Sequence, residues 1–186
     1  MQATPGAPLS NSDAAEESPD RMPPRSRIRL FVLVALVAYG ADLATKVLAV
    51  AKLTGEPPIP VVGDLLTLRL TRNAGAAFSL GTSATLALSL AAIAVILVVI
   101  WLARKVASPM WAVALGLLLG GATGNLTDRL FRQPAPMRGH VVDFLELPNW
   151  PVFNLADSAI VLAAGLIIVQ SFRGVQIDGS TVRRDA

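Results

Sequence analysis

TLALSLAAIAVILVVIWL, which occupies residues 85–102, is a predominantly apolar run without a single charged side chain. A helix rises 1.5 Å per residue, so about 20 residues cross the ~30 Å hydrocarbon core of a bilayer. Three further apolar segments of similar length occupy residues 28–50, 111–127 and 153–172. The sequence therefore predicts an all-α membrane protein with four transmembrane helices.

The composition supports one membrane domain. The chain has 186 residues, of which 53% are hydrophobic and 16% are charged, whereas soluble domains carry about 25% charged residues. We expect the domain to cover residues 28–172. Residues 1–27 are rich in Pro, Ser and acidic side chains, which predicts a disordered tail. We expect residues 173–186 to form a second, C-terminal tail. No small-residue cleavage site follows the first apolar segment, so we expect that segment to be retained as a span.

The distribution of basic residues predicts the orientation. With four spans, one side of the membrane receives Arg21, Arg25, Arg27, Arg29, Arg104, Lys105, Arg173, Arg183 and Arg184. The positive-inside rule makes that side the cytoplasm. Both termini are then cytoplasmic, and two longer loops lie outside.

Each of these two loops contains a strand-like pattern. In the first, Leu66, Leu68 and Leu70 alternate with polar residues, a period of two that is typical of a strand. The second has a similar run over residues 140–147. Turn chemistry at residues 73–75 ends the first run, and prolines at positions 148 and 151 end the second.

Several kinds of site are excluded by residue type. The chain has no cysteine and a single histidine, His140, so thiol nucleophiles, thiolate metal sites and multi-histidine metal sites are absent. The net charge of +3 is explained by membrane topology, and we expect no nucleic-acid partner. A serine mechanism at Ser158 is disfavoured because His140 is the only imidazole available to activate it.

Two aspartates are the strongest candidates for chemistry. A carboxylate near a membrane span is costly and marks a functional site by default. Asp143 is surrounded by apolar neighbours, whereas Asp157 has a second interpretation, because Asn154 can cap the last helix and place Asp157 at its third position. Held close together, the two carboxylates would share a proton, as in aspartic proteases.

Other polar residues accompany these aspartates in or beside the apolar segments. Asp42 and Lys46 are four residues apart and can pair on one helix face, either as a structural ion pair or as site residues. Asn125, Asp128 and Arg129 lie at the end of the third segment and just beyond it, at helical spacing, and indicate the edge of a site.

Two further features have simple structural readings. Asn73 is either an ordinary turn residue or a hydrogen-bond partner for a peptide. Gly116, Gly120 and Gly124 recur every four residues, which predicts close helix packing.

Two non-enzymatic alternatives remain open at this point. A small ion- or proton-coupled carrier would also place charged residues in its spans, although here they gather toward one membrane face. A scaffold without chemistry would tolerate Asn at positions 143 and 157.

The chain resembles bacterial lipoprotein signal peptidase, also called signal peptidase II, over residues 28–172. Five blocks carry the resemblance: DLATK at 42–46, RNAGAAFS at 72–79, GNLTDR at 124–129, GHVVDF at 139–144 and FNLADS at 153–158. Their number and order make the match specific. One departure is the stretch at 130–138, which looks longer than the family pattern and contains two prolines.

The resemblance implies an intramembrane aspartic endopeptidase of the bacterial inner membrane, with four helices and a small extracytoplasmic β-sheet. It implies cleavage of diacylglyceryl-modified prolipoproteins on the amino side of the lipidated cysteine, without a metal or cofactor. Asp143 and Asp157 would be the catalytic dyad. The positions that would bind substrate or support the site are Asn73, Asn125, Arg129, Asn154, Asp42, Lys46 and Asp128. We expect a monomer whose partners are the lipid-modified substrate and membrane lipid.

Overall fold

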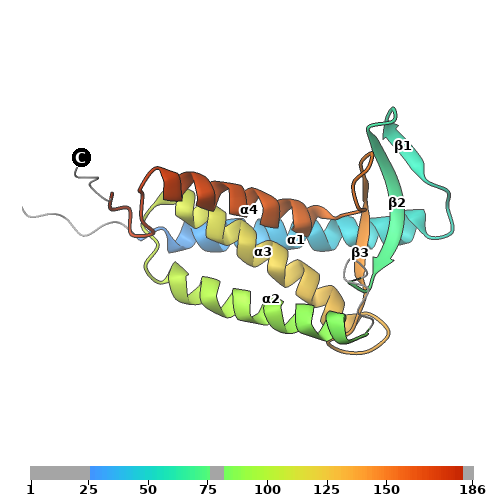
Figure 1. The fold of residues 1–186 in the computed structure, drawn as a ribbon, viewed down its shortest axis with the longest axis horizontal. Helices are drawn as coiled ribbons and strands as arrows, with labels where there is room; N and C mark the ends of the chain where they lie inside the picture. The colour runs from blue at the N-terminus through green and yellow to red at the C-terminus, as the bar shows by residue number, and fades with distance from the viewer. Residues whose placement is uncertain (1–25, 76–81, 182–186) are drawn as a thin grey trace, which may run out of the picture.

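The computed structural model describes residues 26–75 and 82–181, which form four helices and three strands. In chain order they are α1 (Ile28–Leu53), β1 (Ile59–Val62), β2 (Leu66–Asn73), α2 (Thr82–Ala103), α3 (Pro109–Phe131), β3 (Val141–Glu146) and α4 (Leu155–Phe172). Almost all of the predicted N-terminal tail lies outside the described residues. The sheet stands at one end of the helical bundle, while α1 begins and α4 ends at the other (Figure 1).

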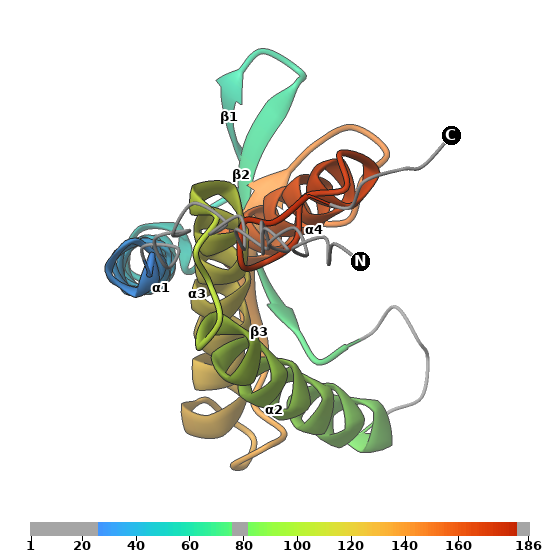
Figure 2. The ribbon, with the colours of Figure 1, turned by 90° about the vertical axis from the view of Figure 1, so that its left-hand side faces the viewer.

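All four helices are long and apolar enough to cross a membrane, which confirms the predicted fold class. α3 lies at the centre and packs against α1, α2 and α4, as the view along the bundle shows (Figure 2). Large apolar side chains such as Leu97 and Val161 are more than 60% exposed on the outside of the bundle. A surface of this kind suits a lipid environment, where these side chains lose nothing by facing outward.

Glycines allow α3 to approach its neighbours closely. A Cβ atom at Gly116 would lie 2.8 Å from the carbonyl oxygen of Phe31, and one at Gly120 would lie 2.7 Å from that of Ala35. Both clashes are with α1, so the predicted packing role of this glycine repeat is confirmed. Gly121 has the same relation to α4, where a Cβ would lie 2.6 Å from the carbonyl oxygen of Ala156.

The three strands form an antiparallel sheet in the order β1-β2-β3. The alternation at residues 66–71 and the run at 140–147 correspond to β2 and β3, as predicted. In the register between them, Thr71 lies opposite Asp143 and Asn73 lies opposite Val141. This register brings the end of β2 beside the candidate aspartate of β3.

The segment after α4 is ordered against the opposite end of the bundle. Residues 175 and 181 form a β-bridge that closes a turn. The backbone N–H groups of Ala107 and Ser108 both donate to the carbonyl of Ile177, at 3.0 and 3.2 Å. Trp111 Nε1 donates to the carbonyl of Val175 at 2.8 Å. Much of the predicted C-terminal tail is thus attached to the connection between α2 and α3.

Candidate active site

The two candidate aspartates meet through a single asparagine. Asp143 lies on β3 and Asp157 in the first turn of α4. Asn154 Nδ2 donates to Asp143 Oδ1 at 2.6 Å, and the backbone nitrogen of Asn154 donates to Asp157 Oδ2 at 3.2 Å. The fully buried Asn154 therefore contacts both carboxylates.

Local helix chemistry fixes the position of Asp157. Asn154 is the N-cap of α4, and its Oδ1 accepts from the backbone nitrogen of Asp157 at 3.0 Å. The reciprocal bond from Asn154 to the Asp157 carboxylate completes a capping box. The predicted capping role of Asp157 is confirmed, and it does not compete with a role beside Asp143, because one carboxylate serves both.

Asn73 is placed at the site by the end of β2. Its Nδ2 donates to Asp143 Oδ2 at 3.0 Å, while its Oδ1 accepts from the backbone nitrogen of Gly75 at 2.8 Å. The turn interpretation of Asn73 is therefore confirmed, and its contact with Asp143 places it among the candidate site residues. Together with Asn154, it gives each oxygen of Asp143 an amide donor.

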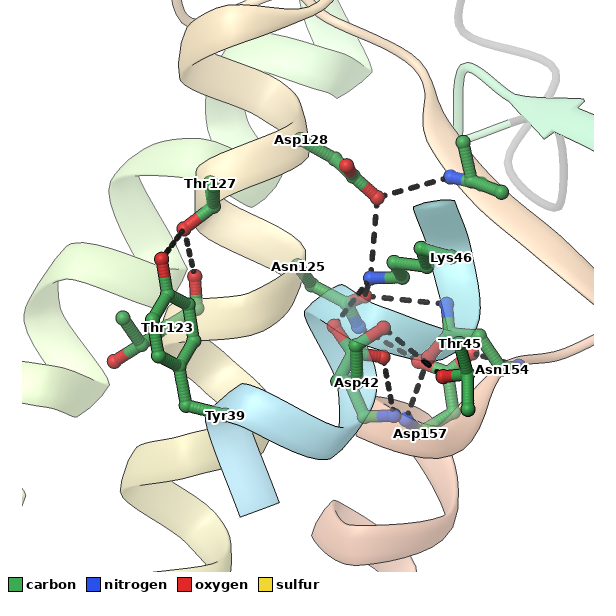
Figure 3. Close-up of polar contacts among 12 residues, drawn as sticks. Tyr39, Asp42, Thr45, Lys46, Thr123, Asn125, Thr127, Asp128, Asn154 and Asp157 are labelled. Atoms are coloured by element: carbon green, nitrogen blue, oxygen red, sulfur yellow. Dashed lines mark hydrogen bonds and ion pairs between the residues drawn. The ribbon is translucent and has the colours of Figure 1, made fainter. Parts of the chain in front are cut away.

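A buried lysine connects α1 with α3 close to Asp157 (Figure 3). Lys46 is 1% exposed, and its Nζ lies 2.8 Å from Asp42 Oδ2 and 3.1 Å from Asp128 Oδ2. It also donates to Asn125 Oδ1 at 2.9 Å. Asn125 Nδ2 in turn donates to Asp157 Oδ1 at 2.8 Å. The predicted Asp42–Lys46 pair is present, and it belongs to a network that reaches the dyad.

The two anions of this network also hold the elements that carry the dyad. Asp42 Oδ1 accepts from the backbone nitrogen of Ala156 at 2.9 Å, next to Asp157. Asp128 Oδ2 accepts from the backbone nitrogen of Val142 at 3.1 Å, next to Asp143. Hydrogen bonds of this kind to charged acceptors are among the stronger ones. A carboxylate from α1 thus fixes the start of α4, and one from α3 fixes β3.

Arg129 supplies a free donor at the site. Its side chain is 8% exposed, and its Nη1 atom has no hydrogen-bond partner among the described residues. Its guanidinium lies in the field of Asp143, Asp157 and Asp128. An unpaired buried donor is costly, so this atom is well suited to an acceptor brought by a ligand.

Burial raises the pKa of Asp143 from 3.8 to about 6. The hydrogen bond from Asn73 opposes this rise by favouring the ionised form, whereas the negative charge of Asp157 adds to it. Asp143 is 2% exposed, so the loss of hydration on burial has the largest effect on its pKa. The dyad therefore contains one carboxyl that retains its proton to unusually high pH.

The family model for signal peptidase (SPase) II matches residues 34–173 of the chain. The chain belongs to the signal peptidase II family. A lipoprotein signal peptidase of Mycolicibacterium smegmatis is 47% identical over 97% of this chain and 76% of its own length. One from Streptomyces griseus is 48% identical over 97% of this chain and 91% of its own length.

Two solved structures are similar to this chain over most of its length. A bacterial membrane enzyme determined by the in meso method at 2.3 Å resolution superposes with a TM-score of 0.70 at 25% identity, covering 89% of this chain and 98% of its own. A second at 1.9 Å has a TM-score of 0.71 at 26% identity, covering 82% and 98%. This member of the signal peptidase II family is therefore a multi-pass bacterial membrane peptidase, which disfavours the carrier and scaffold alternatives.

One ion pair beside these candidate residues was not predicted from the sequence. Arg132 Nε pairs with Asp128 Oδ1, so Asp128 lies between two cations. The spacing of four residues on one helix was the available signal. Among the described residues, no three His, Cys, Asp or Glu side chains are grouped so that they could hold a metal ion.

Proposed function

We propose that this protein removes the signal peptide from diacylglyceryl-modified prolipoproteins, by cleaving on the amino side of the lipidated cysteine with Asp143 and Asp157 as catalytic dyad. The observation that carries the proposal is the convergence of the two carboxylates on Asn154, at hydrogen-bond distances of 2.6 and 3.2 Å. Family membership supports the peptidase activity.

The two carboxyls take different roles because their surroundings differ. Asp143 is buried and its pKa is raised to about 6, so it is the one that holds a proton and donates it to the scissile carbonyl oxygen. Asp157 is less buried and lies at a helix N-terminus, where negative charge is favoured. It is the ionised base that takes a proton from water.

The reaction then balances within the dyad. Water attacks the carbonyl carbon, its proton moves to Asp157, and the proton of Asp143 moves to the carbonyl oxygen. Collapse of the tetrahedral intermediate breaks the C–N bond: the proton on Asp157 passes to the leaving amine, and one hydroxyl proton of the intermediate returns to Asp143 as the new carbonyl forms. Arg129 Nη1, buried and unpaired among the described residues, donates to a carbonyl of the substrate backbone and holds it in place.

An apolar groove beside the dyad supports a lipid-bearing substrate. It lies between α1, α3 and α4 with a volume of about 400 Å³. Its wall includes Ala41, which precedes Asp42, and Leu155 and Ser158, which flank the first turn of α4. An acyl chain lying in this groove would place the attached cysteine near Asp157, and the chain would reach it laterally from the bilayer.

The basic residues support an orientation with both termini in the cytoplasm and the sheet outside. The dyad then lies near the outer surface, where water for hydrolysis is available. All residues of the dyad network come from one chain, so we expect the monomer to be active.

A gel-shift cleavage assay tests this function. Purified protein in lipid receives a diacylglyceryl-modified prolipoprotein and, separately, the unlipidated precursor. We expect cleavage of the lipidated form only, lost in both Asp143→Asn and Asp157→Asn while each variant remains folded. Near-normal turnover by either variant would refute the dyad, and equal cleavage of both precursors would refute the lipid requirement.

A further inference from the structure

A basic cavity lies at the sheet end of the molecule and takes no part in the proposed chemistry. Its volume is about 650 Å³, and it is bounded by the end of α3, the end of β2 and the segment that leads into β3. The residues that line it are Arg72, Phe131, Arg132, Gln133, Pro134 and His140. Most of them belong to or adjoin the stretch at 130–138, which looks longer than the family pattern.

The wall of this cavity is held in place by hydrogen bonds. The backbone nitrogen of His140 donates to the carbonyl of Gln133 at 3.0 Å. The backbone nitrogen of Gly139 donates to the carbonyl of Arg129, also at 3.0 Å. The fully buried Ser89 of α2 donates to the carbonyl of Met137 at 2.7 Å. A Cβ at Gly139 would clash with the last turn of α3, so the segment lies directly against that helix. The cavity is therefore a formed feature of the fold.

The charges that face the cavity are positive and only partly balanced. Arg132 pairs with Asp128. Arg72 has no carboxylate within ion-pair distance among the described residues, and neither does His140. The Arg72 guanidinium offers several donors in a fork that fits phosphate oxygens, and an imidazole donates in either protonation state. The described residues that line the cavity include no carboxylate, and the nearby Asp128 is already paired with Arg132 and Lys46.

The neighbouring surface indicates a membrane-bound ligand. Phe131 ends α3, lines the cavity and is 82% exposed. A large apolar side chain so exposed at the end of a span is free to contact lipid acyl chains. A ligand with a phosphate in the cavity and acyl chains beside Phe131 would satisfy both features.

We propose that this cavity binds the phosphodiester of an anionic phospholipid, with Arg72 and His140 donating to its oxygens and Phe131 contacting its acyl region. Free phosphate shares the headgroup chemistry but lacks the acyl chains. The site is separate from the dyad, so the proposal stands or falls independently of the peptidase mechanism.

Native mass spectrometry of the full-length protein tests the proposal. The probes are dihexanoyl phosphatidylglycerol, dihexanoyl phosphatidylcholine of equal chain length, and inorganic phosphate. We expect phosphatidylglycerol to bind, phosphatidylcholine to bind more weakly because its choline approaches Arg72, and phosphate not to compete at equal concentration. Arg72→Gln should weaken phosphatidylglycerol binding about tenfold, the loss expected for one charge-assisted contact.

Arg69→Gln is the matched control. It removes the same charge from the same strand, but Arg69 pairs with Glu146 outside the cavity, so binding should stay unchanged. His140→Gln gives a second test if Arg72→Gln misfolds, and it should also weaken binding. Equal losses of phosphatidylglycerol binding in Arg69→Gln and Arg72→Gln would show that binding depends only on the net charge of the protein. That result would overturn the proposed site. Failure of phosphatidylglycerol to bind, or competition by phosphate at equal concentration, would overturn the lipid assignment.

Discussion

Lys46 determines which way the Asn125 amide points. Lys46 Nζ donates to Asn125 Oδ1 at 2.9 Å, and an ammonium group has no acceptor. Asn125 must therefore turn its Nδ2 away from Lys46, and that atom donates to Asp157 Oδ1 at 2.8 Å. The charge of a lysine on α1 thus orients a hydrogen bond to the proposed catalytic base on α4.

Lys46→Met should be strongly destabilising. It leaves Asp42, which is fully buried, without a cation. Breaking a buried ion pair from one side costs about 3–5 kcal/mol. We expect a large fall in the thermal unfolding midpoint, measured in detergent, together with loss of cleavage.

The double variant Asp42→Asn with Lys46→Met separates charge burial from packing. It removes both ions, while Asp128 keeps Arg132 as its partner. We expect it to recover part of the stability that Lys46→Met loses. A double variant no more stable than the single one would show that the methylene stem of Lys46 matters more than its charge.

Substitutions of Asn154 should separate its role as the N-cap of α4 from its role as a hydrogen-bond donor to Asp143. Asn154→Ala removes both the cap of α4 and the donor to Asp143, whereas Asn154→Ser keeps a good N-cap but cannot supply the amide donor. We expect Asn154→Ala to lose about 0.5–2 kcal/mol more stability than Asn154→Ser, because only the serine variant keeps a good cap. Both should lower kcat by about tenfold, since the amide donor that positions the Asp143 carboxyl is lost.

Unfolding midpoints and single-turnover cleavage rates measure the two effects of Asn154. If Asn154→Ser cleaved at the wild-type rate, the amide donor to Asp143 would be unimportant for the reaction, and Asn154 would be only a helix cap.

The pH dependence follows from the raised pKa of Asp143. If protonated Asp143 is the acid, kcat/KM must fall as pH rises through about 6, because the proton is lost. Asn73 favours the ionised form, so Asn73→Ala should raise the pKa of Asp143 further. We expect the falling limb to move to higher pH by roughly 0.5–1 unit.

A pH profile of kcat/KM on a lipidated substrate measures this shift. Thr67→Val, on the same strand but opposite Glu146, should leave the limb unmoved. A rate that rises through pH 6 would mean that Asp143 acts in its ionised form and that the roles of the two aspartates are reversed. A falling limb that Asn73→Ala moves to lower pH would mean that Asn73 does not favour the ionised form of Asp143.

Features with a local signature could be predicted from the sequence. The apolar runs predicted the helices, the alternation at Leu66, Leu68 and Leu70 predicted β2, and the spacing of Asn154 and Asp157 predicted the cap. β1 has no comparable pattern, because all four of its residues are exposed. It exists through pairing with β2, which no short stretch of sequence encodes.

The long-range contacts between the candidate site residues were harder to predict from the sequence than contacts within one helix. The spacing of Asp42 and Lys46 predicted their pairing, but not that Asp42 would bind the backbone of Ala156, 114 positions away. Contacts of this kind depend on how close the helices lie. The glycines of α3 set that distance, and a repeat of small residues indicates close packing without identifying the partner helix.

Gly124 makes this dependence testable. A Cβ there would overlap the Asp42 carboxylate, and Asp42 holds both Lys46 and the start of α4. Gly124→Ala should therefore destabilise the protein and lower cleavage, although Ala is the better helix former by about 0.5–1 kcal/mol. Gly165→Ala in α4 is the matched control, because nothing lies within 4 Å of its Cβ position. Unfolding midpoints should fall for Gly124→Ala and stay level or rise for Gly165→Ala. If both variants behaved alike, the close approach at Gly124 would not be what positions Asp42.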